Sequence, residues 1–421
     1  MSQLQKLIDE LCPEGVEYKR IDALFDTFSG MTGVSDKWKE SGNCQFIDYL
    51  NVYNNMKVDV NDLPFATVKS QQQNVLQKGD ILLTCASETP DECAMSSVIR
   101  DEIKDGVFLD DHLFAIRLKD EHKDEVNTTF LNYYMHTLPF RIQVCKKVRG
   151  VTRFYITGKP FMSLEIPVPP LPVQEEIVRI LDKFTTLEAE LEAELDCRKR
   201  QYEYYRDKLL TFSKLTGGGI SEDVKWMTLG EIGIMIKGSG IQKSDFVDDG
   251  YPCIHYGQLH TYFGTFANKN KTFINKGLYD KCKKAKYGDL LIATTSEDVE
   301  ACCKATAWLG EEVAISGDAH IFRHNQDPKY VAYFFQTDDF AKQKRKYASG
   351  VKVVRVNSDN LAKIIIPIPP IEEQRRIVSI LDRFETLTTD LQSGLPAEIA
   401  ARHRQYEYYR DKLLTFKRKV A

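Results

Sequence analysis

Two clusters of basic residues are the first feature of the sequence that could support chemistry. Each surrounds a glycine, Gly150 in the first half of the chain and Gly350 in the second. Lysine and arginine neutralise phosphate groups, so the recurrence predicts contacts to a nucleic-acid backbone, with an ordinary solvated surface as the alternative. The clusters consist of Arg141, Lys146, Lys147, Arg149 and Arg153, and of Lys342, Lys344, Arg345, Lys346, Lys352 and Arg355.

Two short stretches carry side chains that can hydrogen-bond to the edges of bases. Residues 49–55 and 255–262 are rich in asparagine, glutamine, histidine and tyrosine. Polar segments at 87–89 and 295–298 follow two matching predicted strands and could serve either as contacts or as helix caps. The base-edge candidates are Tyr49, Asn51, Asn54, His255, Tyr256, Gln258 and His260.

Motifs for catalysis and metal binding are missing from the sequence. It has no Walker A phosphate loop, and no Asn-Pro-Pro-Tyr/Phe or Asp-Pro-Pro-Tyr signature of an amino-methyltransferase. His255 and His260 are five residues apart, which does not place two imidazoles on one face of a helix. The ten cysteines include no Cys-x-x-Cys pair. We therefore predict a non-catalytic chain without bound zinc.

The elements that would position these residues are revealed by an internal repeat. Residues 201–212 recur without change as residues 405–416. Two upstream segments recur with a shift of 200 residues: 166–171 as 366–371, and 177–184 as 377–384. Such a repeat is too long for a solenoid unit and indicates two tandem halves, each a globular segment followed by a helical arm.

Each arm is predicted to be a long helix that begins after a proline-rich stretch. Apolar residues recur there in alternating steps of three and four, the spacing of a coiled-coil seam, with Arg198 as the polar exception. A helix from about 174 to 212 would be roughly 55–60 Å long, and we expect it to pack antiparallel against the other arm. Gly394 and Pro396 should interrupt the second arm, with Ser393 as a candidate cap. The seam of the first arm comprises Leu191, Leu195, Tyr202, Tyr205, Leu209 and Phe212.

The outer faces of the arms are also identical in the two copies. Packing constrains a seam but places almost no demand on the opposite face of a helix. Because the globular halves have diverged far, the identity of the outer residues predicts a partner that contacts the same face twice. These residues are Tyr204, Arg206 and Asp207, with their copies Tyr408, Arg410 and Asp411. The seam tyrosines Tyr202, Tyr205, Tyr406 and Tyr409 are instead predicted to serve core packing.

Each globular half is predicted to fold as a compact α/β or α+β domain. Runs at 80–84 and 289–293, each preceded by glycine, predict one pair of matching strands, and runs beginning at His112 and His320 predict another. Helices are expected at 3–11, 129–144 and 328–347, and a glycine-rich hinge at 214–220. The predicted segments are globular domains at 1–165 and 217–365 and helical regions at 166–216 and 366–421.

Composition limits the class of protein. The 421 residues are 43% apolar, enough for two cores of ordinary domain size. The net charge of −4 predicts weak non-specific binding to polyanions, so nucleic-acid contacts must come from local patches. There is no apolar run long enough for a membrane span, and unpaired cysteines suit a reducing cytoplasm.

The repeated motif Gln-Tyr-Glu-Tyr-Tyr-Arg-Asp-Lys-Leu-Leu-Thr-Phe, with Ile-Val-x-Ile-Leu-Asp upstream, resembles the specificity subunits of type I restriction–modification systems. Residues 252–261 are similar to that family's target-recognition domains. The resemblance covers nearly the whole chain. It implies two target-recognition domains separated by two long antiparallel helices that form a coiled-coil spacer, in a pseudo-two-fold arrangement.

The resemblance also implies partners. Each domain would read half of a bipartite site on double-stranded DNA, two methyltransferase subunits would bind the arms, and restriction subunits would supply motor and endonuclease activities. This chain would bind no cofactor, whereas the complex would use S-adenosylmethionine, and ATP with Mg for restriction. Base-reading residues do not transfer within the family, because its recognition domains differ greatly.

Two other functions compete with that of a DNA reader. A self-contained adenine methyltransferase and nuclease is disfavoured by the missing methyltransferase signature. A purely structural coiled-coil adaptor without DNA contact is the second alternative. Adenine methylation by the purified chain would support the enzyme, and absence of DNA binding under all conditions would support the adaptor.

Overall fold

The computed structural model describes residues 3–39, 41–69, 73–212, 223–350, 352–389 and 394–419. The chain forms two compact units, which we call the first and second units; the first comprises Met1–Glu190 with Ile399–Ala421, and the second Leu191–Glu398. Each unit therefore takes helical residues from both arms. The predicted hinge at 214–220 and the candidate cap Ser393 lie outside the described residues.

The first unit contains two four-stranded sheets. In one, antiparallel strands are ordered β2 (Phe25–Ser29), β10 (Leu113–Leu118), β6 (Ile81–Thr84) and β8 (Ser96–Val98). The other has the order β3 (Val34–Lys39), β5 (Phe65–Val68), β4 (Cys44–Ile47) and β9 (Val107–Leu109), with β4 and β9 parallel. A two-stranded pairing joins β1 (Tyr18–Arg20) to β13 (Glu165–Pro167). In a three-stranded sheet, β12 (Phe154–Tyr155) lies between β11 (Arg149–Gly150) and β7 (Ala86–Ser87). The helices before the arm are α1 (Gln3–Leu11), α2 (Ile21–Leu24), α3 (Tyr49–Asn54), α4 (Thr128–Met135), α5 (Leu138–Cys145) and α6 (Gly158–Met162), with 3-10 turns η1 (Pro90–Glu92) and η2 (Asp120–His122).

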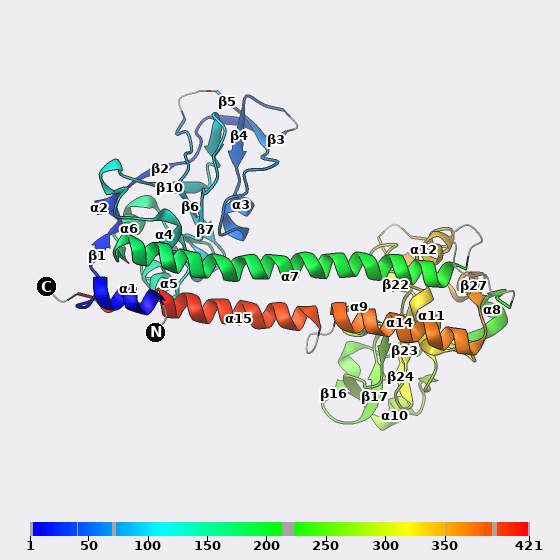
Figure 1. The fold of residues 1–421 in the computed structure, drawn as a ribbon. Coiled ribbons are helices and arrows are strands. Elements are labelled where there is room, and N and C mark those ends of the chain that lie inside the picture. The colour runs from blue at the N-terminus through cyan, green and yellow to red at the C-terminus, as the bar shows by residue number, and fades with distance from the viewer. Residues whose placement is uncertain are drawn as a thin grey trace. The chain divides into compact units, whose positions relative to one another are not determined.

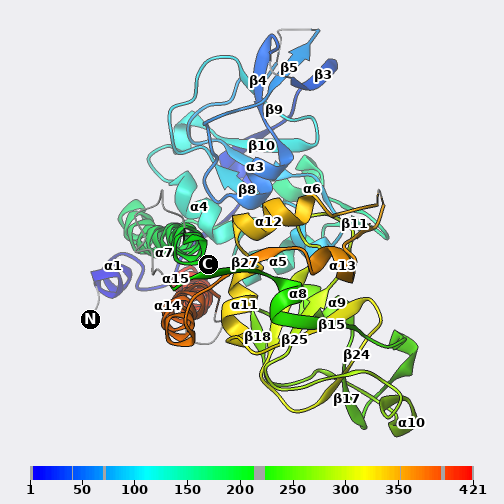
Figure 2. The same cartoon turned by 90° about the vertical axis from the view of Figure 1, so that its right-hand side faces the viewer.

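The second unit has a related arrangement, seen in the lower part of Figure 2. Its first sheet has the order β15 (Gly233–Lys237), β25 (Ala319–His324), β21 (Leu290–Ala293), β23 (Lys304–Trp308) and β18 (Phe266–Ala267). Its second has the order β16 (Phe246–Val247), β19 (Thr272–Ile274), β17 (Tyr251–Ile254), β24 (Val313–Ile315) and β20 (Lys284–Ala285). Two-stranded pairings join β14 (Lys225–Thr228) to β27 (Ile365–Ile368), and β22 (Thr295–Ser296) to β26 (Val354–Arg355). The short helices are α8 (Leu229–Ile232), η3 (Lys243–Asp245), α9 (Tyr256–Thr261), α10 (Lys276–Tyr279), α11 (Pro328–Phe334), α12 (Asp338–Arg345) and α13 (Ser358–Leu361).

An ion pair between an arginine and a buried aspartate connects two strands of the main sheet in each unit. Asp80, just before β6, accepts bonds of 2.7 and 2.6 Å from Arg117 of β10. Asp289, just before β21, accepts bonds of 3.0 and 2.7 Å from Arg323 of β25. The predicted strand pairs are thus confirmed, but aligning the arginines makes Asp318, rather than His320, the counterpart of His112. That part of the sequence match was wrong by two residues.

The helices predicted at 129–144 and 328–347 are each broken in two. The break falls at Thr137 in the first unit and at Thr337 in the second, and both hydroxyls donate to a carbonyl of the preceding turn, at 2.7 and 2.8 Å. Thr337 also accepts a bond from the amide of Phe340 and so caps the new helix. A threonine hydroxyl that bonds to backbone groups at this point takes the place of helical hydrogen bonds and permits the chain to turn. The periodicity of apolar residues alone did not reveal this break.

The arms consist of α7 (Leu171–Thr211), α14 (Ile371–Thr389) and α15 (Leu395–Leu413). Helix α7 has 41 residues, links the two units and would be about 60 Å long at 1.5 Å per residue. The second arm is divided, as predicted, and Pro396 lies in the first turn of α15. Among the described residues, no helix combines the length and apolar character that a membrane span requires.

Antiparallel packing of the arms is visible inside each unit (Figure 1). In the first unit, the ring of Tyr409 stacks on Phe184 at 5.5 Å, and His403 lies 2.8 Å from Glu188. In the second unit, Tyr205 stacks on Phe384 at 5.8 Å.

The most buried residues of the repeated motif do not belong to the predicted seam. Leu210 is 1% exposed and lies in the core of the second unit, and Leu414 is 1% exposed and lies in the core of the first. Tyr406 is also buried in the first core, and burial raises the pKa of its hydroxyl to about 12. The motif at the end of each arm therefore completes the core of a globular domain, in addition to contacting the other arm.

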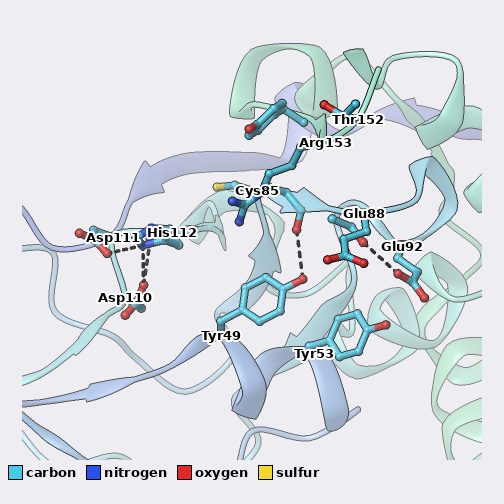
Figure 3. A pocket seen from close by; sticks show the side chains of 13 residues that line it. Tyr49, Tyr53, Cys85, Glu88, Glu92, Asp110, Asp111, His112, Thr152 and Arg153 are labelled. Carbon is cyan, nitrogen blue, oxygen red and sulfur yellow. Dashed lines mark hydrogen bonds and ion pairs between the residues drawn. The ribbon is translucent and has the colours of Figure 1, made fainter. Parts of the chain in front are cut away.

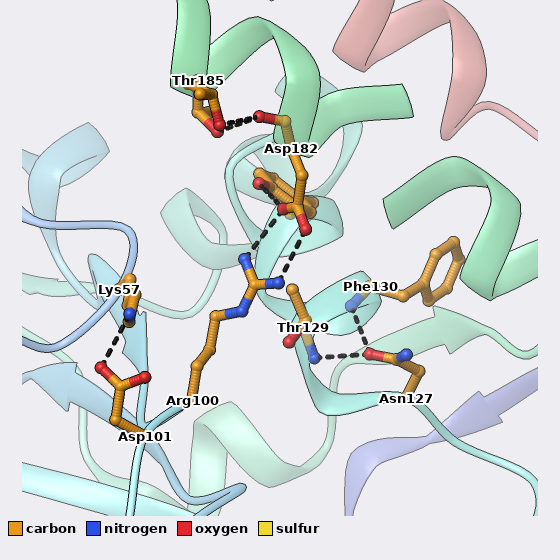
Figure 4. Close-up of polar contacts among 10 residues, drawn as sticks. Lys57, Arg100, Asp101, Asn127, Thr129, Phe130, Asp182 and Thr185 are labelled. Atoms are coloured by element: carbon orange, nitrogen blue, oxygen red, sulfur yellow. Dashed lines mark hydrogen bonds and ion pairs between the residues drawn. The ribbon is translucent and has the colours of Figure 1, made fainter. Parts of the chain in front are cut away.

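Each globular domain is attached to the arm that follows it through partly buried polar contacts. In the first unit, Arg100 donates two bonds to Asp182 of α7, at 2.8 and 2.7 Å, and the Tyr133 hydroxyl donates a third at 2.7 Å (Figure 4). In the second unit, Lys329 and the Tyr333 hydroxyl contact Asp382 of α14, at 2.8 and 2.7 Å. The shared aspartate and tyrosine fix each domain on its own helix.

Candidate nucleic-acid interface

A tight hairpin follows α5 in the first unit and presents part of the basic cluster. Gly150 has φ +131°, and a Cβ added there would lie 2.0 Å from the carbonyl oxygen of Arg153. Gly350 has φ +113° and the same 2.0 Å approach to the carbonyl oxygen of Val353. Only glycine adopts this conformation without strain or collision. The hairpin exposes 90% of Val151.

The basic hairpin lies beside the polar segment predicted at the end of the matching strand. In the first unit, β12 pairs with β7, with Phe154 opposite Ser87. In the second unit, β26 pairs with β22, with Val354 opposite Ser296. Two of the three kinds of patch identified in the sequence are thus adjacent in both units.

The third kind of patch forms a short helix that contacts the same strand. The Tyr49 hydroxyl, at the start of α3, donates to the carbonyl oxygen of Ala86 at 3.0 Å. In the second unit, a ring nitrogen of His260, near the end of α9, lies 3.0 Å from the carbonyl oxygen of Thr295. Ala86 and Thr295 are equivalent residues in β7 and β22. The domains therefore anchor a polar helix to the same carbonyl through different side chains.

In the first unit, these elements enclose a pocket of about 1260 Å³ (Figure 3). Glu92 accepts a 2.9 Å bond from the Ser87 hydroxyl, and this bond, with others from Thr89 and Tyr53, holds the pKa of Glu92 below its usual value. The rings of Tyr49 and Tyr53 stack at 5.7 Å on one side. The lining consists of Tyr49, Tyr53, Cys85, Ala86, Ser87, Glu88, Glu92, Asp110, Asp111, His112, Thr152, Arg153 and Tyr155.

One group in this pocket has the composition of a metal site. Asp110, Asp111 and His112 bring three potential ligand atoms within 4.8 Å of one another. The Nδ1 atom of His112 lies 2.6 Å from Asp111 and 3.3 Å from Asp110, so the ring already contacts both carboxylates. These mutual contacts account for the grouping without an ion.

Most of the predicted basic residues are exposed and available to a phosphate backbone. The exposed members are Lys146, Lys147, Arg149, Arg153, Lys342, Arg345, Lys346, Lys352 and Arg355. Arg345 already forms an ion pair with Glu300, with bonds of 3.0 and 2.7 Å.

The prediction that Lys344 contacts DNA is wrong. Its side chain is 3% exposed, and the ammonium group donates to the carbonyl oxygens of Glu300 and Cys302 at 2.8 and 2.9 Å. Burial lowers the pKa of this lysine. Arg141 has the corresponding role in the first unit, where its guanidinium bonds to carbonyls that include that of Ala94, at 2.9 Å. Both cations therefore stabilise a loop of their own domain instead of binding a ligand.

Several of the side chains predicted to contact base edges instead form hydrogen bonds with nearby backbone groups. The Asn51 amide donates to the carbonyl of Asp59 at 2.7 Å and accepts from its amide at 3.0 Å. Gln258 accepts a 3.0 Å bond from the amide of His255, whose ring accepts one of 3.2 Å from Gly257. These three side chains are therefore already hydrogen-bonded within the protein.

Asn54 and Tyr256 differ in their surroundings. The Asn54 side chain is exposed at the end of α3. Tyr256 is partly buried, with its ring 4.6 Å from that of His255. Of the two, Asn54 is the more accessible to a ligand.

The predicted partner surface on the arms is only partly exposed. Tyr204 and Tyr408 are each 60% exposed, and in each copy a lysine ammonium, Lys208 or Lys412, lies 5.7 Å from the ring. The Arg206 and Arg410 side chains are 11% and 14% exposed and lie against seam tyrosines, contrary to the prediction of an outer position. Asp207 and Asp411 pair with these arginines and are partly buried.

Tyr204 also borders a depression of about 890 Å³ in the second unit. The depression is lined by Arg200, Glu203, Tyr204, Arg206, Asp207, Lys208, Thr211, Gln336 and Asp338. Asp207 accepts a bond from the amide of Asp338 at 3.3 Å. The exposed tyrosine therefore stands where the arm meets the globular domain.

Sequence reasoning missed the residues that attach the domains to the arms. Tyr133 and Tyr333 lie 200 residues apart, as do Asp182 and Asp382. The spacing of the repeat was thus a usable signal for these side chains. The pocket residues from Asp110 to His112 carried no such signal, because the second half has different residues there.

Comparison with known proteins gives a consistent result. The family model described as "Type I restriction modification DNA specificity domain" matches residues 13–196 and again 221–401. The specificity subunit of the type I restriction enzyme EcoR124I/EcoR124II of Escherichia coli is 35% identical over 300 residues, covering 68% of this chain and 70% of that protein. A putative type I specificity subunit of Haemophilus influenzae, S.HindORF215P, is 33% identical over 321 residues, covering 70% and 74%.

Solved structures share the fold. A chain of a type I R-M system, solved to study complex assembly and conformational transition, superposes with a TM-score of 0.63 at 18% identity, covering 95% of this chain and 97% of that one. The HsdS subunit of Thermoanaerobacter tengcongensis gives a TM-score of 0.50 at 17% identity, covering 96% and 97%.

Proposed function

The chain belongs to the family of type I restriction–modification DNA specificity subunits, and from that premise we propose that each of its two domains reads one half of a bipartite DNA target. The observation that carries the proposal is the recurrence of one surface in both units. Each combines a basic hairpin, a polar strand end and a short polar helix. The framework is shared, whereas the exposed side chains differ, as two readers of different half-sites require.

The exposed lysines and arginines around Gly150 and Gly350 supply the contacts that do not depend on sequence. Such contacts position a protein on the duplex, and groups that face the base edges then discriminate between sequences. Lys146, Lys147 and Arg149 take this role in the first domain, and Lys346 and Lys352 in the second. The net charge of −4 favours this division, because it limits attraction to DNA outside these patches.

The arms bind the catalytic partners. Two identical motifs, each with an exposed tyrosine beside a lysine, favour two copies of one partner, a methyltransferase subunit. Restriction subunits join this complex for cleavage. The chain itself has no motif for catalysis, so S-adenosylmethionine, and ATP with Mg, are used by the partners. The complex acts in the cytoplasm, where its DNA is.

A domain exchange tests the proposal. Residues 13–165 are replaced by the corresponding domain of a relative with a different target, and the complex with its methyltransferase is used to methylate DNA, which is then sequenced for modified adenines. One half of the target should change and the other should remain. A change in both halves, or in neither, would contradict separate reading by the two domains.

A further inference from the structure

Two charged side chains in the pocket of the first unit, Glu88 and Arg153, differ from the others in their contacts. Glu92 is bonded to Ser87, and His112 contacts the neighbouring carboxylates. Within the part of the chain that the structure describes, Glu88 and Arg153 form no hydrogen bond or ion pair, although both line the pocket and are exposed. In Figure 3 the Arg153 side chain extends toward Cys85, and that of Glu88 lies nearer Tyr53 and Glu92.

Strand pairing brings the chain near these two residues together. In the antiparallel register of β7 and β12, Tyr155 faces Ala86 and Phe154 faces Ser87. Glu88 directly follows Ser87, and Arg153 directly precedes Phe154, so the two residues stand in the bends just beyond the last pair of the ladder. A guanidinium and a carboxylate therefore line the same pocket from the two ends of one strand pairing.

A phosphate group does not suit this pair of charges. A carboxylate that lines the same pocket repels an anion and offsets the attraction of Arg153. The exposed Lys146, Lys147 and Arg149 are better placed for the backbone, and the ladder partner of Arg149 is Tyr155, which carries no carboxylate. The ligand that fits Arg153 and Glu88 together must offer acceptors and a donor next to each other.

A G·C base pair offers that combination in the major groove. Guanine presents its N7 and O6 atoms as acceptors for arginine, and the N4 amino group of cytosine donates to a carboxylate. We propose that Arg153 and Glu88 together read one G·C pair in the half-site of the first domain. The inference rests on the DNA-reading function proposed above and assigns a base pair to specific side chains.

The second domain has the carboxylate of this pair but not the arginine. Ser296 faces Val354 in β22 and β26, and the residues just beyond this last pair are Glu297 and Val353. Valine offers no donor to guanine, so the second half-site should lack this contact. The difference makes the second domain an internal control, because its framework is the same while its chemistry is not.

The test uses the full chain in complex with its methyltransferase partner and DNA duplexes that carry the methylation target. In duplexes with each base pair of the first half-site replaced in turn, Arg153→Gln and Glu88→Gln should each lose discrimination at the same single G·C pair, by roughly 10- to 100-fold. Replacing that guanine by 7-deazaguanine, which lacks the N7 acceptor, should weaken the wild type and leave Arg153→Gln unaffected. Lys147→Gln is the matched control and should weaken all duplexes equally.

The outcomes separate this inference from the function on which it rests. If the wild-type complex shows no preference among the duplexes, the DNA-reading function itself fails. If the wild type is selective but Arg153→Gln weakens all duplexes equally, the arginine contacts a phosphate and the inference is overturned. Loss of discrimination in the second half-site instead of the first would overturn it as well. Circular dichroism of each variant checks that these exposed substitutions leave the fold intact.

Discussion

The repeated motif at the C-terminal end of the chain should stabilise the domain at the N-terminal end. Leu414 is 1% exposed and lies in the core of the first unit, so Leu414→Ala removes a fully buried side chain. Such a change costs about 2–5 kcal/mol, depending on how far the cavity collapses. For a unit of this size, each kcal/mol lowers the midpoint by roughly 2–4 °C, so we expect the first unit to lose about 4–20 °C.

Hydrogen exchange on the full chain, read by mass spectrometry, distinguishes the two units. In Leu414→Ala, amides of β6 and β10 should exchange faster, while those of β21 and β25 keep their protection. The mirror variant Leu210→Ala should have the opposite pattern, because Leu210 is buried in the second core. Leu187→Ala, at a residue of α7 that is 48% exposed, is the control and should alter neither unit appreciably. Equal loss in both units, or no loss in either, would refute the assignment of each motif to a single core.

Three further predictions concern the arms and the basic patches. Tyr204→Ala combined with Tyr408→Ala should weaken assembly with the methyltransferase in gel filtration, while thermal unfolding of the isolated chain shifts little; a large loss of stability would place these tyrosines in the core. Lys346→Ala should weaken DNA binding about equally across sequences and reduce the slope of log affinity against log salt by roughly one; selective loss at one base position would mean that this lysine reads a base. Insertion of four residues at 188–194 lengthens α7 by about 6 Å. Since one base pair takes about 3.4 Å of DNA, the unread spacer between the half-sites of the methylated target should grow by one or two base pairs. An unchanged spacer in an active complex would show that the arms do not set the distance between the half-sites.

Much of the architecture was predictable because it rests on local or repeated signals. The helix at Gln3–Leu11 and the long first arm follow from apolar periodicity and from prolines that mark their boundaries. The interruption of the second arm follows from Gly394 and Pro396. The special role of Gly150 and Gly350 was visible only as recurrence, and the backbone supplied its reason, a left-handed conformation with a carbonyl where a Cβ would be.

Errors arose where side chains were engaged by residues distant in the sequence. Lys344 belonged to a basic run, but the carbonyls that surround it come from a loop about 40 residues earlier. Asn51 and Gln258 have the right chemistry for base edges, yet each satisfies nearby backbone groups. A sequence pattern records which donors and acceptors a side chain carries, and only the folded chain determines whether they are already used.

The sequence by itself determined the duplication, the two arms, the family resemblance and the places where polar and basic residues gather. Identical motifs and helical periodicity are properties of neighbouring residues, and they survive in a linear string. The tertiary structure alone decided that the motif of each arm completes the core of a domain, and that Arg153 and Glu88 line the same pocket. Both depend on which strands and helices come together across long separations, and the energy of that choice is distributed over the whole core rather than recorded at any one position.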